Sequence, residues 1–101
     1  MTVYEHRAVV TVSGGSTGTT TLSVQGGLLQ NVLIRALTTP ATTYFRADLT
    51  DSNNIQRVNW GYHTGEINDH GISFPMVGTY TLNITNASAV DTFRIILGVR
   101  E

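Results

Sequence analysis

The last third of the chain alternates apolar and polar residues, a pattern that restricts it to β structure. Two segments carry the alternation, residues 78–85 and residues 91–100, with a short polar turn between them. Because successive side chains of a strand point to opposite faces, each segment has one apolar and one polar face. The apolar faces comprise Tyr80, Leu82 and Ile84, then Phe93, Ile95, Leu97 and Val99. We expect an antiparallel hairpin in which these faces are buried and Arg94 is exposed.

Weaker alternation predicts strands in the rest of the chain. The expected strands cover residues 4–13, 20–24, 32–37, 43–50 and 58–62, with Ile72 and Phe74 forming a further short one. Gly26-Gly27 is expected to end the second strand, and the third is apolar on both faces, as a central strand is. Residues 61–77 lack a sustained period and are expected to form a long loop.

Seven or eight short strands without any helical period define the expected fold. They predict a single all-β domain over residues 1–101, an antiparallel two-sheet β-sandwich of jelly-roll or immunoglobulin-like type. The glycine-rich segment 14–18 is expected to be the turn after the first strand. It leads into a strand and lacks the G-K-[ST] ending of a phosphate-binding loop.

The composition excludes several classes of protein. The chain contains no Cys, which excludes disulfides, thiolate nucleophiles and zinc sites built on sulfur. Its six basic residues, balanced by seven acids, are single scattered Arg residues, whereas a nucleic-acid-binding protein usually carries a basic stripe. No apolar run approaches the length of about 18 residues that spans a membrane. We expect no nucleic-acid or membrane partner, and the absence of Lys favours a surface covered by protein partners.

Residues 63–70 concentrate polar side chains of the types that bind metals. They include His63, Glu66, Asp69 and His70, but the spacing matches no helical or knuckle metal site. We expect a solvated polar loop with no bound metal and no cofactor. The chain also lacks the G-x-S-x-G setting of a serine nucleophile, so we predict that it is not an enzyme.

Two aromatic residues beside this segment indicate an alternative function. Trp60 and Tyr62 are expected on one face of a strand next to His63, where aromatic rings can stack on a sugar. Because Trp is highly buried on average, a core position for Trp60 is the simpler interpretation. The alternative function is therefore a carbohydrate-binding, lectin-like β-sandwich module that uses these residues together with Asp69 and His70.

Three segments resemble accessory virion proteins of tailed phages. They read Gly-Thr-Tyr-Thr-Leu-Asn-Ile from Gly78, Asp-Thr-Phe-Arg-Ile-Ile-Leu from Asp91, and Thr-Tyr-Phe-Arg-Ala-Asp-Leu-Thr-Asp from Thr43. The chain is most similar to the head decoration, or cement, proteins that sit on the outside of the capsid lattice. The resemblance covers most of the chain and implies a non-enzymatic structural protein that binds and stabilises the major capsid protein lattice. It assigns no role to an individual residue.

The resemblance also implies where the protein acts and with what. We expect a location on the capsid surface after synthesis in the host cytoplasm, because the N-terminus lacks a secretory signal. The expected partners are the major capsid protein or another virion protein, and a second copy of the chain in a homodimer or homotrimer. Contacts are expected in the first segment and around the long loop. The expected contact residues are Val3, Tyr4, His6, Arg7, Trp60, Tyr62, His63, Glu66, Asp69 and His70.

Overall fold

The computed structural model describes residues 3–13 and 16–101, and this part of the chain forms seven strands. They are β1 (Val3–Val12), β2 (Gly18–Ala36), β3 (Tyr44–Asp51), β4 (Gln56–Thr64), β5 (Glu66–Asp69), β6 (Phe74–Thr85) and β7 (Asp91–Arg100). The described residues contain no helix, and so none long and apolar enough to cross a membrane. The predicted all-β fold is confirmed. The turn predicted at residues 14–18 lies partly outside the described residues.

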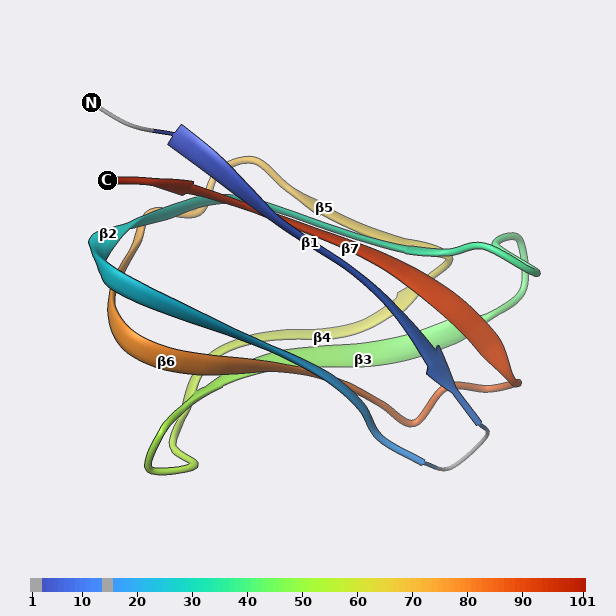
Figure 1. Ribbon diagram of the computed structural model, residues 1–101. Coiled ribbons are helices and arrows are strands. Elements are labelled where there is room, and N and C mark those ends of the chain that lie inside the picture. The colour runs from blue at the N-terminus through green and yellow to red at the C-terminus, as the bar shows by residue number, and fades with distance from the viewer. Residues whose placement is uncertain (1–2, 14–15) are drawn as a thin grey trace.

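Hydrogen bonds join the strands into one continuous, open, antiparallel sheet. The strand order is β1-β7-β2-β6-β3-β4, and β5 pairs with β2 outside this path. The first half of β2 pairs with β6, and its second half pairs with β7 and β5. Because β2 bends, β1, β7 and β5 lie opposite β6, β3 and β4 (Figure 1). The predicted division into two separate sheets is not confirmed, since β2 runs through both groups of strands.

β2 is a single strand of 19 residues where two strands were expected. Its pairing with β6 shifts register between Val24 and Gly27, so Gly26-Gly27 bends the strand instead of ending it. A Cβ atom at Gly27 would lie 2.8 Å from the carbonyl oxygen of Arg100, an approach that only glycine permits. The second half of β2 is central, as predicted, because β7 and β5 flank it.

β6 and β7 form as predicted, but they do not pair with each other. β2 lies between them in the sheet, so the predicted hairpin is wrong. Their connection, residues 86–90, is instead hydrogen-bonded to the start of β3. The Ser88 N–H donates to the Tyr44 carbonyl, and the Tyr44 N–H donates to Ser88 Oγ. Alternation identifies which side chains face the core, but it does not identify the partner strand.

Residues 61–77 are more regular than expected. They contain the end of β4, all of β5 and the start of β6, which begins at Phe74. Gly65 joins β4 to β5 with a φ of 77°, and its N–H donates to the Thr43 carbonyl. A Cβ atom there would overlap the carbonyl oxygen of Pro40, so this tight junction admits only glycine. A strand of four residues is too short for its period to be recognised in the sequence.

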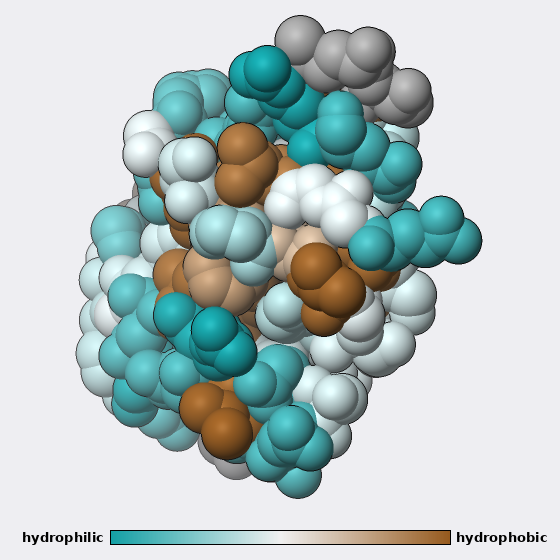
Figure 2. All heavy atoms as spheres, turned by 90° about the vertical axis from the view of Figure 1, so that its left-hand side faces the viewer, coloured by the Kyte–Doolittle hydropathy of each residue, from teal (hydrophilic) through white to brown (hydrophobic). Residues whose placement is uncertain are grey.

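Several large hydrophobic side chains are exposed on the strands and their connections. They are Val3, Val9, Leu37, Tyr44, Ile55, Tyr62, Val77 and Val90. Figure 2 shows the end of the molecule that carries the start of β1, the end of β7 and the bend of β2, where hydrophobic side chains lie among hydrophilic ones. Single exposed apolar residues are normal on a protein surface, so the informative cases are those that lie together.

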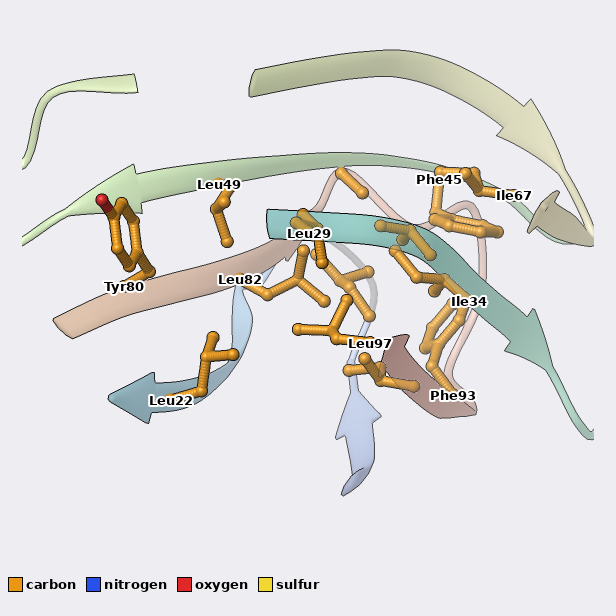
Figure 3. Close-up of a cluster of buried hydrophobic side chains, with 14 of the residues drawn as sticks. Leu22, Leu29, Ile34, Phe45, Leu49, Ile67, Tyr80, Leu82, Phe93 and Leu97 are labelled. Atoms are coloured by element: carbon orange, nitrogen blue, oxygen red, sulfur yellow. The ribbon is translucent and has the colours of Figure 1, made fainter. Parts of the chain in front are cut away.

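The core lies between the two opposed groups of strands. Side chains from β2, β3, β6 and β7 point toward one another there (Figure 3). Phe45 of β3 and Phe93 of β7 meet edge to face, with ring centroids 4.7 Å apart. Phe93, Ile95 and Leu97 are fully buried and Arg94 is exposed, so the predicted facing of the last strand is confirmed.

Candidate functional site

An open groove lies where the connection 86–90 passes the start of β3 and the end of β4. It has a volume of about 630 Å³ and is lined by Tyr44, Tyr62, His63, Thr64, Asn86, Ala87 and Ser88. β3 and β4 are paired along this edge, with Tyr44 opposite Thr64. Three segments that are distant in the sequence therefore meet at one surface.

Tyr44 and Tyr62 supply the aromatic surface of the groove. Their ring centroids lie 6.5 Å apart with an interplanar angle of 65°, and the residues are 52% and 57% exposed. The Tyr62 hydroxyl accepts a hydrogen bond of 2.9 Å from Asn86 Nδ2. The mutual contact and this hydrogen bond orient the rings while much of their surface stays accessible to a partner.

The other wall of the groove is formed by the connection 86–90, which is held in place by its backbone conformation and by hydrogen bonds. Asn86 has a φ of 54°, in the left-handed region that Asn adopts more readily than most residues. Ala87 is buried and belongs to the core. Next to it, Ser88 makes the two hydrogen bonds with Tyr44 described above. Because the wall is anchored on both sides of Ala87, the Asn86 amide is held beside the Tyr62 ring.

His63 and Trp60 lie in different surroundings although they are close in sequence. His63 lines the groove, and its Nε2–H donates to the Trp60 carbonyl at 2.9 Å. The β3–β4 register shifts just before Gly61, which has a φ of 71°. Trp60 is partly buried against the core, and its Nε1–H donates to Asp69 Oδ2 at 3.1 Å. The bulge therefore separates Trp60 from Tyr62, and the aromatic pair of this surface is Tyr44 with Tyr62.

The remaining residues expected around the loop are spread along β5 and the bend after it. Glu66 is exposed on β5, opposite Arg35 of β2. Asp69 also accepts a hydrogen bond from the Gly71 N–H, and His70 is exposed in the bend. In residues 3–13 and 16–101, no three or more His, Cys, Asp or Glu side chains are grouped so that they could hold a metal ion.

The expected contact residues of the first segment all lie on β1. Val3 and Arg7 are exposed on its outer face, whereas Tyr4 and His6 are half-buried on its inner face. His6 Nε2 lies 3.0 Å from Thr20 Oγ1 of β2. Burial raises the pKa of the Tyr4 phenol, and the nearby Glu101 carboxylate raises it further. These residues belong to a different surface element from the groove, so the two expected contact regions remain separate.

A buried carboxylate, that of Asp91, supports both walls of the groove. Asp91 is 1% exposed and follows the connection 86–90 directly. Its oxygens accept hydrogen bonds of 2.7 to 3.1 Å from the N–H groups of Thr38, Thr39 and Thr92 and from the hydroxyl of Thr43. Thr43 immediately precedes Tyr44. Sequence reasoning did not identify Asp91, because one Asp at the start of a strand resembles an ordinary turn residue.

The ionisation of Asp91 couples folding to pH. Burial alone raises the pKa of this carboxyl, but the four hydrogen bonds outweigh it and hold the pKa well below its ordinary value of 3.8. A folded-state pKa below the unfolded value gives stability that is present above about pH 4 and lost as the pH falls further. We expect the urea concentration at the midpoint of unfolding to decrease as the pH is lowered below about 4. The decrease should be smaller in Asp91→Asn. An equal acid dependence of both proteins would contradict this assignment.

Sequence comparisons with protein families and curated proteins do not identify a relative. No protein-family model matches this chain, and no curated protein matches its sequence closely enough to indicate common ancestry.

Proposed function

We propose that this protein is a non-enzymatic structural protein that binds a repetitive protein surface through the Tyr44–Tyr62 groove. The observation that carries the proposal is the exposed tyrosine pair, with the Tyr62 hydroxyl bonded to Asn86. Tyr is enriched at protein interfaces, where a few aromatic residues supply most of the binding free energy. Side chains that are already oriented lose less conformational entropy on binding.

The proposed partner is a virion protein, and the proposed location is the outer surface of the capsid. The resemblance of the segments from Thr43, Gly78 and Asp91 to head decoration proteins supports this choice. The segment from Thr43 contains Tyr44, and the residues just before Asp91 form the other wall of the groove. A lattice presents many identical sites, so contacts that are weak individually sum to stable attachment.

We also propose that the open sheet, which the bend of β2 folds into two opposed groups of strands, behaves mechanically as a two-sheet sandwich. The core side chains lie between the strand group β1, β7 and β5 and the group β6, β3 and β4, as Figure 3 illustrates for part of the core. A tightly packed interior transmits strain and deforms little. Such a body would hold the groove rigidly when a partner binds to its surface.

The test compares groove variants with a variant of another exposed apolar residue. Tyr44→Ser and Tyr62→Ser should each reduce co-sedimentation with purified capsids of the encoding virus by about tenfold or more, the usual effect of truncating an interface hot spot. Ile55→Ser is the matched control, because Ile55 is also exposed but lies at the opposite end of the β3–β4 hairpin. Binding of both tyrosine variants at the level of the wild type would contradict the proposal.

A carbohydrate-binding module is the second candidate function. The observation that favours it is the position of the Asn86 amide and His63 beside two exposed tyrosine rings, because sugars stack on aromatic faces and hydrogen-bond to such groups. A glycan array and the capsid sedimentation assay distinguish the two functions. Binding to a glycan but not to capsids, abolished by Tyr62→Ser, would replace the first proposal with the second.

A further inference from the structure

β1 presents a free sheet edge. Among the described residues it pairs only with β7, in an unbroken register from Val3 opposite Arg100 to Val12 opposite Asp91. It also ends the strand order of the sheet. Edge strands expose unpaired N–H and C=O groups, and natural proteins commonly protect them with bulges, Pro or Lys. β1 is ten residues long and contains none of these three, and its two charged side chains, Glu5 and Arg7, have opposite signs.

The sequence of β1 is complementary to itself when two copies run antiparallel. Residues 3–9 read Val-Tyr-Glu-His-Arg-Ala-Val. A two-fold axis at His6 would place Glu5 of each copy opposite Arg7 of the other. Opposite charges and aliphatic residues that face each other across strands stabilise a sheet. The pairs formed would be Val3 with Val9, Tyr4 with Ala8, Glu5 with Arg7, and His6 with itself.

The neighbouring registers are unfavourable for the same residues. The outward-pointing backbone groups of an edge strand alternate, so an antiparallel partner slips in steps of two residues. One such step places Glu5 opposite Glu5 of the other copy, and the step in the other direction places Arg7 opposite Arg7. Like charges directly opposite each other destabilise a strand pair. The register centred on His6 is thus favoured over both of its neighbours.

The side chains that would meet on the outer face of β1 are accessible. Val3 is 61% exposed and Val9 is 63% exposed. Arg7 Nη2 lies 2.6 Å from Glu5 Oε1 of the same strand, so both charged groups already lie on this face. In the paired state the two Glu5–Arg7 pairs would form one cluster of four charges, with a valine pair at each end. Each copy would then cover exposed apolar surface of the other.

We propose that a second copy of this chain binds along β1, antiparallel and centred on His6, so that one sheet continues through both copies. The inference does not depend on the Tyr44–Tyr62 groove and stands whether the groove binds protein or carbohydrate. A two-fold dimer would carry two grooves, and two linked contacts bind a repetitive surface more tightly than one.

Charge reversal gives a direct test. In Arg7→Glu, both central pairs of the dimer would join two carboxylates, and in Glu5→Arg both would join two guanidinium groups. We expect analytical ultracentrifugation to show a Kd for self-association that is raised about tenfold or more in each variant alone, because like charges placed opposite each other destabilise an interface. An equimolar mixture restores opposite charges at both pairs and should form a heterodimer with nearly the affinity of the wild type.

The control variant is Glu66→Arg, which changes the net charge as Glu5→Arg does but on the exposed face of β5. It should dimerise like the wild type. Three results would overturn the proposal: a wild-type protein that is monomeric at several hundred micromolar, single variants that dimerise as well as the wild type, or a mixture that associates no better than its components.

Discussion

Asp91→Ala should destabilise the protein by about 3 to 5 kcal/mol, because it removes the acceptor of several buried hydrogen-bond donors at once. The carboxylate accepts hydrogen bonds from three backbone N–H groups and from the buried Thr43 hydroxyl. Each buried donor that loses its acceptor costs about 1 to 3 kcal/mol, partly recovered where water can reach it. The loss is a large fraction of the 5 to 15 kcal/mol by which a domain of this kind is stable. Urea denaturation monitored by fluorescence measures it.

Asp51→Ala is the matched control for this prediction. Asp51 also accepts two backbone hydrogen bonds, from Asn53 and Ile55, but in an exposed turn where water can replace it. Its replacement should shift the midpoint much less than the replacement of Asp91. Equal shifts for the two variants would show that burial of the Asp91 network contributes nothing to stability. Because Asp91 supports both groove walls, its variant should also weaken partner binding at temperatures where it remains folded.

Phe93→Ala should cost about 3 to 5 kcal/mol, the usual loss when a buried aromatic ring is removed. Phe93 has no exposed surface and contacts Phe45 of the opposed strand group edge to face. Its removal would leave a cavity between the two groups of strands, in addition to the lost transfer free energy. Equilibrium denaturation should show a lower midpoint with an unchanged slope.

Val90→Ala serves as the comparison for Phe93. Val90 is exposed just before β7, so its truncation should change the free energy of unfolding by no more than about 0.5 kcal/mol. A Phe93→Ala protein with the midpoint of the wild type would mean that the last strand faces the other way.

The facing of the strands could be predicted from the sequence because it is a local property. Apart from Gly98, each buried position in β7 and in the second half of β6 follows from alternation over a few residues. The pairing of those strands could not be predicted, because it depends on residues far away in the chain. β2 inserts between β6 and β7, and Gly26-Gly27 was expected to end β2 because glycine pairs mark turns and bulges alike.

The groove was predicted only in part for the same reason. Tyr62 and His63 were expected contact residues and do line it, but Tyr44 and Asn86 come from segments that the sequence does not connect. The bulge before Gly61 places Trp60 against the core. A register shift of this kind cannot be recognised in the sequence pattern. The expectation that Trp60 and Tyr62 lie on one face could therefore be corrected only from the structure.

Hydroxyl-radical footprinting of the protein, free and bound to capsids, tests most directly the claim that the groove is the contact surface. Tyr44 and Tyr62 are exposed in the free protein and should be oxidised readily, whereas Tyr80 is buried and should react little in either state. We expect binding to protect Tyr44 and Tyr62 from oxidation severalfold and to leave the oxidation of the exposed control residue Ile55 unchanged. Oxidation of both groove tyrosines at the same rate in free and capsid-bound protein would contradict it.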